Sequence, residues 1–158
     1  MLRELQVIKD KPAIASYKAG ETTISTGMAV VKNETDKTFE FASAETAADL
    51  YFVDKERIPT GVNAARGDIS DYDVDFTTIS ENEFGKLIAY LPGERFATDA
   101  YVETGIATGV RLSANTAGKI VKAATTVESK YVCGGFYTDN GHKLVIVEVS
   151  DTTGKNAS

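Results

Sequence analysis

Apolar residues occupy every second position in several short runs of this chain, and polar turns separate the runs. The clearest example is residues 109–123, GVRLSANTAGKIVKA, where two such runs flank a turn that contains Asn and Gly. Alternation with a period of two is typical of a strand with one buried face, and Asn and Gly favour tight turns. This segment is therefore predicted to be a β-hairpin.

A second segment follows the same plan 82 positions upstream. Residues 22–32 are predicted to be a strand, 33–37 a polar turn and 38–42 a second strand. Each half then continues into an aromatic, apolar run. The identical residues at this offset are Thr26-Gly27 and Thr108-Gly109, Asn33 and Asn115, Lys37 and Lys119, and Ala42 and Ala124. These matches lead to the hypothesis that the chain consists of two weakly similar halves.

The C-terminal part contains the strongest hairpin pattern. Residues 133–137 and 142–149 are rich in strand-forming side chains, and the turn between them contains Asn140-Gly141, which tolerates positive φ at both positions. The unbroken apolar run Leu144–Val147 indicates a strand that is covered on both faces. Gly134-Gly135 lies within a strand-like run, where glycine often marks a bulge or a close backbone approach.

Other segments are less regular. Residues 43–49 are predicted to form one turn of helix, with a loop as the alternative, because good helix formers follow a Ser that could cap them. Residues 64–85 are rich in acids and are expected to form an ordered excursion. Residues 1–11 could form an N-terminal arm that adds a strand to a neighbour, and residues 150–158, which lack an apolar anchor, are predicted to be a mobile tail.

These patterns predict a mainly β fold, a compact antiparallel β-barrel or sandwich with short helical segments. The chain has 158 residues, of which 42% are hydrophobic and 25% charged, so it suits one globular domain with its own core. We place this single domain at residues 1–149.

Charge and hydropathy exclude several partners. The net charge is −6, without a run of Lys and Arg, so nucleic acid would be repelled over most of the surface. No segment approaches eighteen apolar residues and no apolar leader opens the chain, so we expect neither a membrane span nor export by an evident leader.

The sequence offers few groups for catalysis. Cys133 is the single cysteine, so the chain has no internal disulfide, and it is expected to be a buried small hydrophobe rather than a nucleophile. His142 is the only histidine and is expected to be exposed next to a turn. No glycine-rich phosphate loop is present. We therefore expect no enzyme, no catalytic residues and no cofactor.

Three short motifs have a functional and a simpler interpretation. Asp71, Asp73 and Asp75 alternate as in a calcium loop, but an EF-hand needs Gly and Glu where this chain has Phe76 and Asn82. A looser cation site is possible, and a solvated acidic loop or a contact face for basic partners is favoured. Arg66-Gly67-Asp68 matches the cell-adhesion tripeptide, but a match of three residues is expected to be a coincidence. Glu94 and Arg95 follow the Pro92-Gly93 turn and could join an intersubunit salt bridge, although an exposed turn is favoured.

Several runs together resemble the capsid decoration, or cement, proteins of tailed bacteriophages. The resemblance lies in Pro92-Gly93-Glu94-Arg95-Phe96-Ala97-Thr98, Gly109-Val110-Arg111-Leu112, Gly118-Lys119-Ile120-Val121-Lys122-Ala123, the closing hairpin, and Tyr51-Phe52-Val53-Asp54-Lys55-Glu56-Arg57-Ile58-Pro59-Thr60-Gly61. It implies a compact β-rich virion protein without a catalytic centre. Such a protein would be made in the bacterial cytoplasm, bind the major capsid protein on the outer surface of the shell, and often form trimers. The resemblance assigns no individual site residues.

Two alternatives remain at this stage. A tail or head-fibre component would share the composition and the β content, and a cation-binding β module would use the loop from Asp71 to Asp75. A hydrolytic enzyme has the least support, because no acid, base and nucleophile occur at a suggestive spacing.

Overall fold

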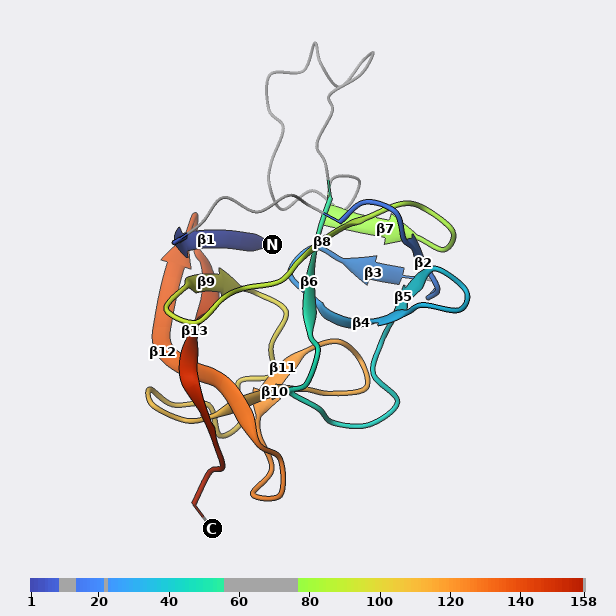
Figure 1. The fold of residues 1–158 in the computed structure, drawn as a ribbon. Helices are drawn as coiled ribbons and strands as arrows, with labels where there is room; N and C mark the ends of the chain where they lie inside the picture. The colour runs from blue at the N-terminus through green and yellow to red at the C-terminus, as the bar shows by residue number, and fades with distance from the viewer. Residues whose placement is uncertain (9–13, 22, 56–76, 158) are drawn as a thin grey trace.

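The computed structural model describes residues 1–8, 14–21, 23–55 and 77–157, and this part of the chain consists of β-strands joined by turns (Figure 1). The mainly β prediction is confirmed. The strands are β1 (Leu2–Gln6), β2 (Lys18–Ala19), β3 (Thr23–Ser25), β4 (Ala29–Asn33), β5 (Thr38–Glu40), β6 (Tyr51–Asp54), β7 (Thr78–Ser80), β8 (Lys86–Ile88), β9 (Arg95–Thr98), β10 (Leu112–Ala114), β11 (Ile120–Lys122), β12 (Ser129–Asp139) and β13 (His142–Gly154).

The strands form two larger sheets and two smaller pairs. The N-terminal half contains the sheet β2-β5-β4-β6-β8 and the pair β3-β7, while the sheet β1-β9-β13-β12 and the pair β10-β11 contain most of the C-terminal half. Figure 1 shows these two groups side by side, with β6 running between them. The N-terminal strand β1 lies in the C-terminal group, where it pairs with β9.

The predicted hairpins are confirmed. The β4–β5 turn lies where it was predicted, with Asn33 as the last residue of β4, and β10 and β11 pair across the turn of the segment 109–123. The predicted single strand 22–32 is wrong: it is two strands, β3 and β4, separated at Thr26-Gly27, and β3 pairs with β7. In the β12–β13 hairpin, Asn140 and Gly141 have φ values of 51° and 84°, as a two-residue turn of this kind requires. The ladder shifts register between Cys133 and Gly135, whose φ is 113°, so the predicted glycine bulge is also present.

The two halves share several equivalent strand pairings, which supports the hypothesis of two weakly similar halves, although among the described residues the β3–β7 pair occurs only in the first half. We name residues 14–88 repeat 1 and residues 96–148 repeat 2. The offset is 82 residues from Ile14 to Phe96 and 81 from Phe39 to Ile120, because the second hairpin has the shorter turn. Three strand pairings of repeat 1 each have an equivalent in repeat 2. The antiparallel pair Ile14–Leu87 corresponds to Phe96–Val147, and the parallel pair Ala19–Phe39 corresponds to Tyr101–Ile120. The antiparallel pair Ala29–Phe52 corresponds to Arg111–Val132.

The loops before β4 and β10 repeat in the same detail. Gly27 donates its N–H to the Val53 carbonyl at 2.8 Å, and Gly109 donates to the Cys133 carbonyl at 2.8 Å. Both glycines have positive φ, 91° and 85°, which a residue with a side chain adopts only with strain. The Thr-Gly pair found in both halves of the sequence therefore marks one conserved chain reversal within the duplicated unit.

Strand β6 joins the cores of the two repeats. Val53 packs into a cluster formed by residues of repeat 1, and its neighbour Phe52 points to the opposite face, as alternation along a strand requires. There Phe52 contacts Phe96, with ring centroids 4.3 Å apart, and Tyr131, at 5.8 Å. Tyr90 stacks on Phe96 at 4.1 Å. This aromatic cluster belongs to both repeats and holds them together.

The structure corrects the predictions for both ends of the chain. Met1 is buried and its ammonium group lies 2.7 Å from the Thr26 carbonyl and 2.6 Å from an Asp99 carboxylate oxygen, so residues 1–8 form part of the protein's own fold rather than a free arm. The predicted mobile tail is also wrong, because residues 150–154 continue β13 and Asn156 makes three hydrogen bonds to the body. Backbone pairing anchors both segments, and the buried Met1 side chain also anchors the N-terminal one.

Two internal predictions also need correction. Residues 43–49 form no helix; Thr46 instead exchanges two backbone hydrogen bonds with Ala114, at 3.0 and 2.8 Å, and this tertiary pairing outweighs a weak helix propensity. The described part of the acidic segment 64–85 begins at Thr77 and contains β7, which pairs with β3, so regular structure returns earlier than expected. The remainder of that segment, with its aspartates and Arg66-Gly67-Asp68, lies outside the described residues.

We predict that Phe52→Ala lowers the free energy of unfolding by about 3–5 kcal/mol, because it removes a fully buried ring from the core shared by the repeats. Urea denaturation followed by circular dichroism measures this change. Phe84→Ala is the matched control, because 58% of the Phe84 side chain is exposed, and it should change stability by about 0.5 kcal/mol or less. Equal losses for the two variants would contradict a shared aromatic core.

Candidate functional site

The cysteine and the histidine are far apart. Cys133 is 1% exposed and burial raises the pKa of its thiol, which confirms the prediction of a buried small residue. His142 is exposed at the start of β13, opposite Asp139 on β12. Six residues along a strand separate Cys133 from Asp139, which is roughly 20 Å. The fold therefore does not bring the two side chains into one catalytic pair.

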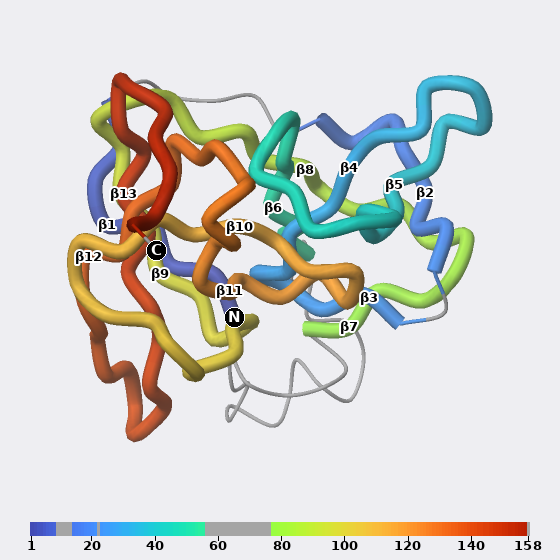
Figure 2. The backbone as a smooth tube through the Cα atoms, turned by 90° about the horizontal axis from the view of Figure 1, so that it is seen from below, coloured from blue at the N-terminus to red at the C-terminus, as the bar shows by residue number. Residues whose placement is uncertain are grey.

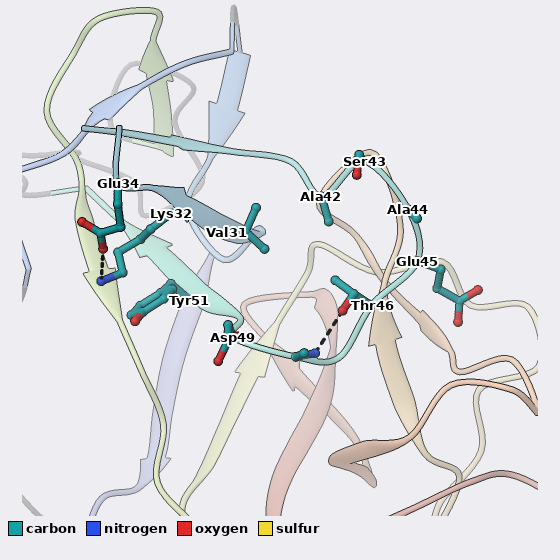
Figure 3. Close-up of a pocket in the computed structure, with 11 residues that line it drawn as sticks. Val31, Lys32, Glu34, Ala42, Ser43, Ala44, Glu45, Thr46, Asp49 and Tyr51 are labelled. Carbon is teal, nitrogen blue, oxygen red and sulfur yellow. Dashed lines mark hydrogen bonds and ion pairs between the residues drawn. The ribbon is translucent and has the colours of Figure 1, made fainter. Parts of the chain in front are cut away.

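A hollow in the surface lies beside the connection between β5 and β6 (Figure 3). Its volume is about 710 Å³. It is lined by Val31, Lys32, Glu34, Ala42, Ser43, Ala44, Glu45, Thr46, Ala48, Asp49 and Tyr51. One wall is formed by β4 and the start of β6, and the other by the connection that pairs with β10. The hollow therefore lies where repeat 1 meets repeat 2.

Lys32 and Glu34 form a fixed charge cluster on one wall of this hollow. The Lys32 ammonium is 3.0 Å from Glu34 and lies over the rings of Tyr51 and Tyr17, at 4.8 and 5.2 Å from their centroids. Glu34 also accepts a hydrogen bond from the Tyr17 hydroxyl at 2.5 Å, and it forms an ion pair with Lys37 at 3.0 Å. The hydrogen bond from Tyr17, with those from Lys32 and Lys37, lowers the pKa of Glu34 to about 2.

Glu45 serves the junction between the repeats rather than the hollow. Its carboxylate accepts a hydrogen bond from the Ser113 hydroxyl at 2.6 Å and another from the Ala124 N–H at 2.8 Å. Figure 3 shows its side chain pointing away from Lys32 and Tyr51. Lys32 and Glu34, the charges of one wall, are thus already paired, and the lining residues include neither histidine nor cysteine. The sequence places Glu34 only in a polar turn, because its hydrogen-bond partner Tyr17 lies 17 residues away in the chain.

A second surface feature is a set of exposed apolar side chains at and near the edge strand β1. Four of its side chains are 41–62% exposed: Leu5, Val7, Ile8 and Leu91, which we call the β1 patch. Glu94 lies beneath it, with 0% exposure; one carboxylate oxygen accepts from the Ile8 N–H at 3.1 Å and the other from the Leu91 N–H at 2.6 Å. One buried carboxylate therefore fixes the backbone at two of the exposed apolar residues.

The Pro92-Gly93 turn shapes the same patch. Gly93 has a φ of 86°, and a Cβ at this position would lie 2.7 Å from Ile8, so only glycine allows Ile8 to pack here. The expectation for Glu94 and Arg95 was wrong: Glu94 is buried, and Arg95 pairs with Glu148 of the same chain at 2.7 Å. Local sequence could not show this burial, because Ile8 lies far away in the chain.

The described ranges contain no group of three or more His, Cys, Asp or Glu side chains that could hold a metal ion. A helix long and apolar enough to cross a membrane is likewise absent from the part of the chain that the structure describes. Comparison of the chain with protein-family models, curated proteins and solved structures finds no match.

We predict that the stabilising effect of Glu34 disappears in acid. Its pKa in the folded protein is about 2, below the ordinary value of 4.5, so the folded state favours the charged form. The contribution is fully present above about pH 4.5 and is lost as the pH falls towards 2. Melting temperatures of the wild type and Glu34→Gln should therefore differ at pH 7 and converge near pH 2. A difference that stays constant over this range would contradict the charged cluster.

Proposed function

We propose that this chain is a virion structural protein of a tailed bacteriophage that binds the outer surface of the capsid and stabilises the shell. The observation that carries the proposal is the β1 patch, whose exposed Ile8 and Leu91 are fixed at their backbones by the buried Glu94. Exposed apolar patches of this kind are typical of protein–protein contact sites. The run from Pro92 to Thr98, on which the resemblance to decoration proteins partly rests, builds the support of this patch.

The rigidity of the patch supports a binding role. Ordering of flexible side chains and loops on association costs affinity, so a surface already fixed in the free protein retains more of its contact energy. Complete cover of one exposed Ile or Leu side chain contributes at most about 1.5–3 kcal/mol, and these residues are already partly covered. The patch thus supplies a modest affinity for each site on the major capsid protein.

A modest affinity is sufficient for a protein that acts over a whole shell. A ligand that binds the assembled shell, and not its separated subunits, stabilises each site by about 2.7 kcal/mol when its free concentration is a hundred times the dissociation constant. The acidic surface, with a net charge of −6, suits the outside of a particle that packs DNA inside. The same surface would serve a tail or head-fibre component, and the test must separate these two positions.

The test mixes the purified protein with expanded heads of the source phage prepared without it, and with isolated tails. Sedimentation should show saturable binding to heads at micromolar protein, with a raised melting temperature of the shell. Ile8→Asp should weaken binding at least tenfold, because it places a charge in the apolar contact. Phe84→Asp is the matched control: Phe84 is 58% exposed and Ile8 62%, and only Ile8 belongs to the patch.

Three outcomes would count against the proposal. Absence of binding to heads at micromolar protein would overturn the decoration role, and binding to tails alone would replace it with a tail component. Wild-type binding by Ile8→Asp would remove the β1 patch as the contact surface. Circular dichroism of both variants confirms that any loss of binding is not a loss of folding.

A further inference from the structure

Repeat 2 covers one end of repeat 1 with the turn between β10 and β11. Gly118 in this turn accepts a hydrogen bond from the Ala29 N–H at 2.8 Å. Its φ is 68°, and a Cβ at this position would lie 2.5 Å from the ring of Phe41 and 3.0 Å from the Ala29 carbonyl oxygen. The covering turn therefore needs glycine, and Ala29 is only 1% exposed beneath it.

The equivalent end of repeat 2 is covered by the C-terminal segment. Arg111 is the counterpart of Ala29, and its N–H donates to the side-chain oxygen of Asn156 at 2.8 Å. The Asn156 amide nitrogen donates to the carbonyls of Arg111, at 2.9 Å, and Ala123, at 2.7 Å. The Arg111 guanidinium also donates to the Thr152 carbonyl at 3.0 Å. The amide of Asn156 thus takes the place that the Gly118 peptide has on repeat 1.

Repeat 1 has a turn equivalent to the covering turn of repeat 2, and this turn is exposed. It connects β4 and β5, and Asn33 accepts hydrogen bonds from the following backbone there, as Asn115 does in the turn of repeat 2. Figure 1 shows this turn at the right of the molecule, away from the C-terminus at the lower left, and Figure 2 shows the same turn from below. Lys37, with a φ of 55°, occupies the position of Gly118. Its side chain prevents the close approach that Gly118 makes.

We propose that Asn156 and Lys37 prevent this chain from associating head to tail with copies of itself. The surface around Arg111 and Ala123 is a docking surface for the β4–β5 turn of a second copy, and Asn156 occupies it in the single chain. Lys37, in the β4–β5 turn of the second copy, blocks the same contact because its side chain prevents the close approach of that turn. Because the docking surface and the turn are different parts of the molecule, their contact would be heterologous and would repeat from copy to copy. Repeat arrays commonly need such terminal caps to stay soluble.

The test combines two substitutions, Lys37→Gly and Asn156→Ala, and measures molecular mass by light scattering over a series of protein concentrations. The double variant should show a mass that rises with concentration beyond that of the wild type. Each single variant should keep the wild-type mass, because Lys37 or Asn156 still blocks the contact. Lys37→Gly with Lys155→Ala is the matched control, since Lys155 is a neighbouring exposed residue, and it should also behave as the wild type.

Truncation after Gly154, combined with Lys37→Gly, provides a second route to the same surface and should give the same rise in mass. A folded double variant that keeps the wild-type mass at every concentration would overturn the proposal. Association of Asn156→Ala alone, to the same extent as the double variant, would overturn the role assigned to Lys37. These outcomes are independent of capsid binding, so they test this proposal separately from the proposed function.

Discussion

The contact of Phe52 with the aromatic side chains of repeat 2 is the interaction on which the rest of the structure depends. Strand β6 sends Val53 into the core of repeat 1 and Phe52 into the cluster with Phe96 and Tyr131. Two small β units are thereby merged into one body with a continuous core. This matters because a small unit buries a smaller share of its surface, so its apolar burial only marginally offsets the conformational entropy lost on folding.

The duplication is easier to see in the backbone than in the side chains. Few residues are identical between the repeats, yet equivalent strands pair in the same order and Gly27 and Gly109 make the same chain reversal. The positions that diverge are those where the environments of the two repeats differ. Ala29 lies under a neighbouring repeat and is small, whereas its counterpart Arg111 lies under the C-terminal segment and donates a hydrogen bond to the Thr152 carbonyl. Ala29 and Arg111 thus differ because different parts of the chain cover them: the β10–β11 turn covers Ala29, and the C-terminal segment covers Arg111.

Much of the local structure could be predicted from the sequence, because hairpins depend on alternation and on turn residues a few positions apart. The β12–β13 hairpin with Asn140-Gly141 and the bulge at Gly135 are examples. Segments held by distant partners could not be predicted in this way. Residues 43–49 pair with Ala114 instead of forming a helix, and the C-terminal segment is held through Asn156. No local property of these segments shows which strand they contact.

In the candidate surfaces too, local turns could be predicted from the sequence, whereas contacts with distant residues could not. The turn at Pro92-Gly93 was predictable, but the burial of Glu94 depends on residues 8 and 91 meeting above it, and a lone glutamate in a turn suggests exposure. A buried carboxylate is stabilising only if its hydrogen bonds compensate for lost hydration. Here both oxygens receive backbone N–H groups, and the backbone bearing Ile8 and Leu91 is fixed as a result. The sequence feature that resembles decoration proteins is thus connected to a physical property, the rigidity of an exposed apolar surface, and that property is what a binding role requires.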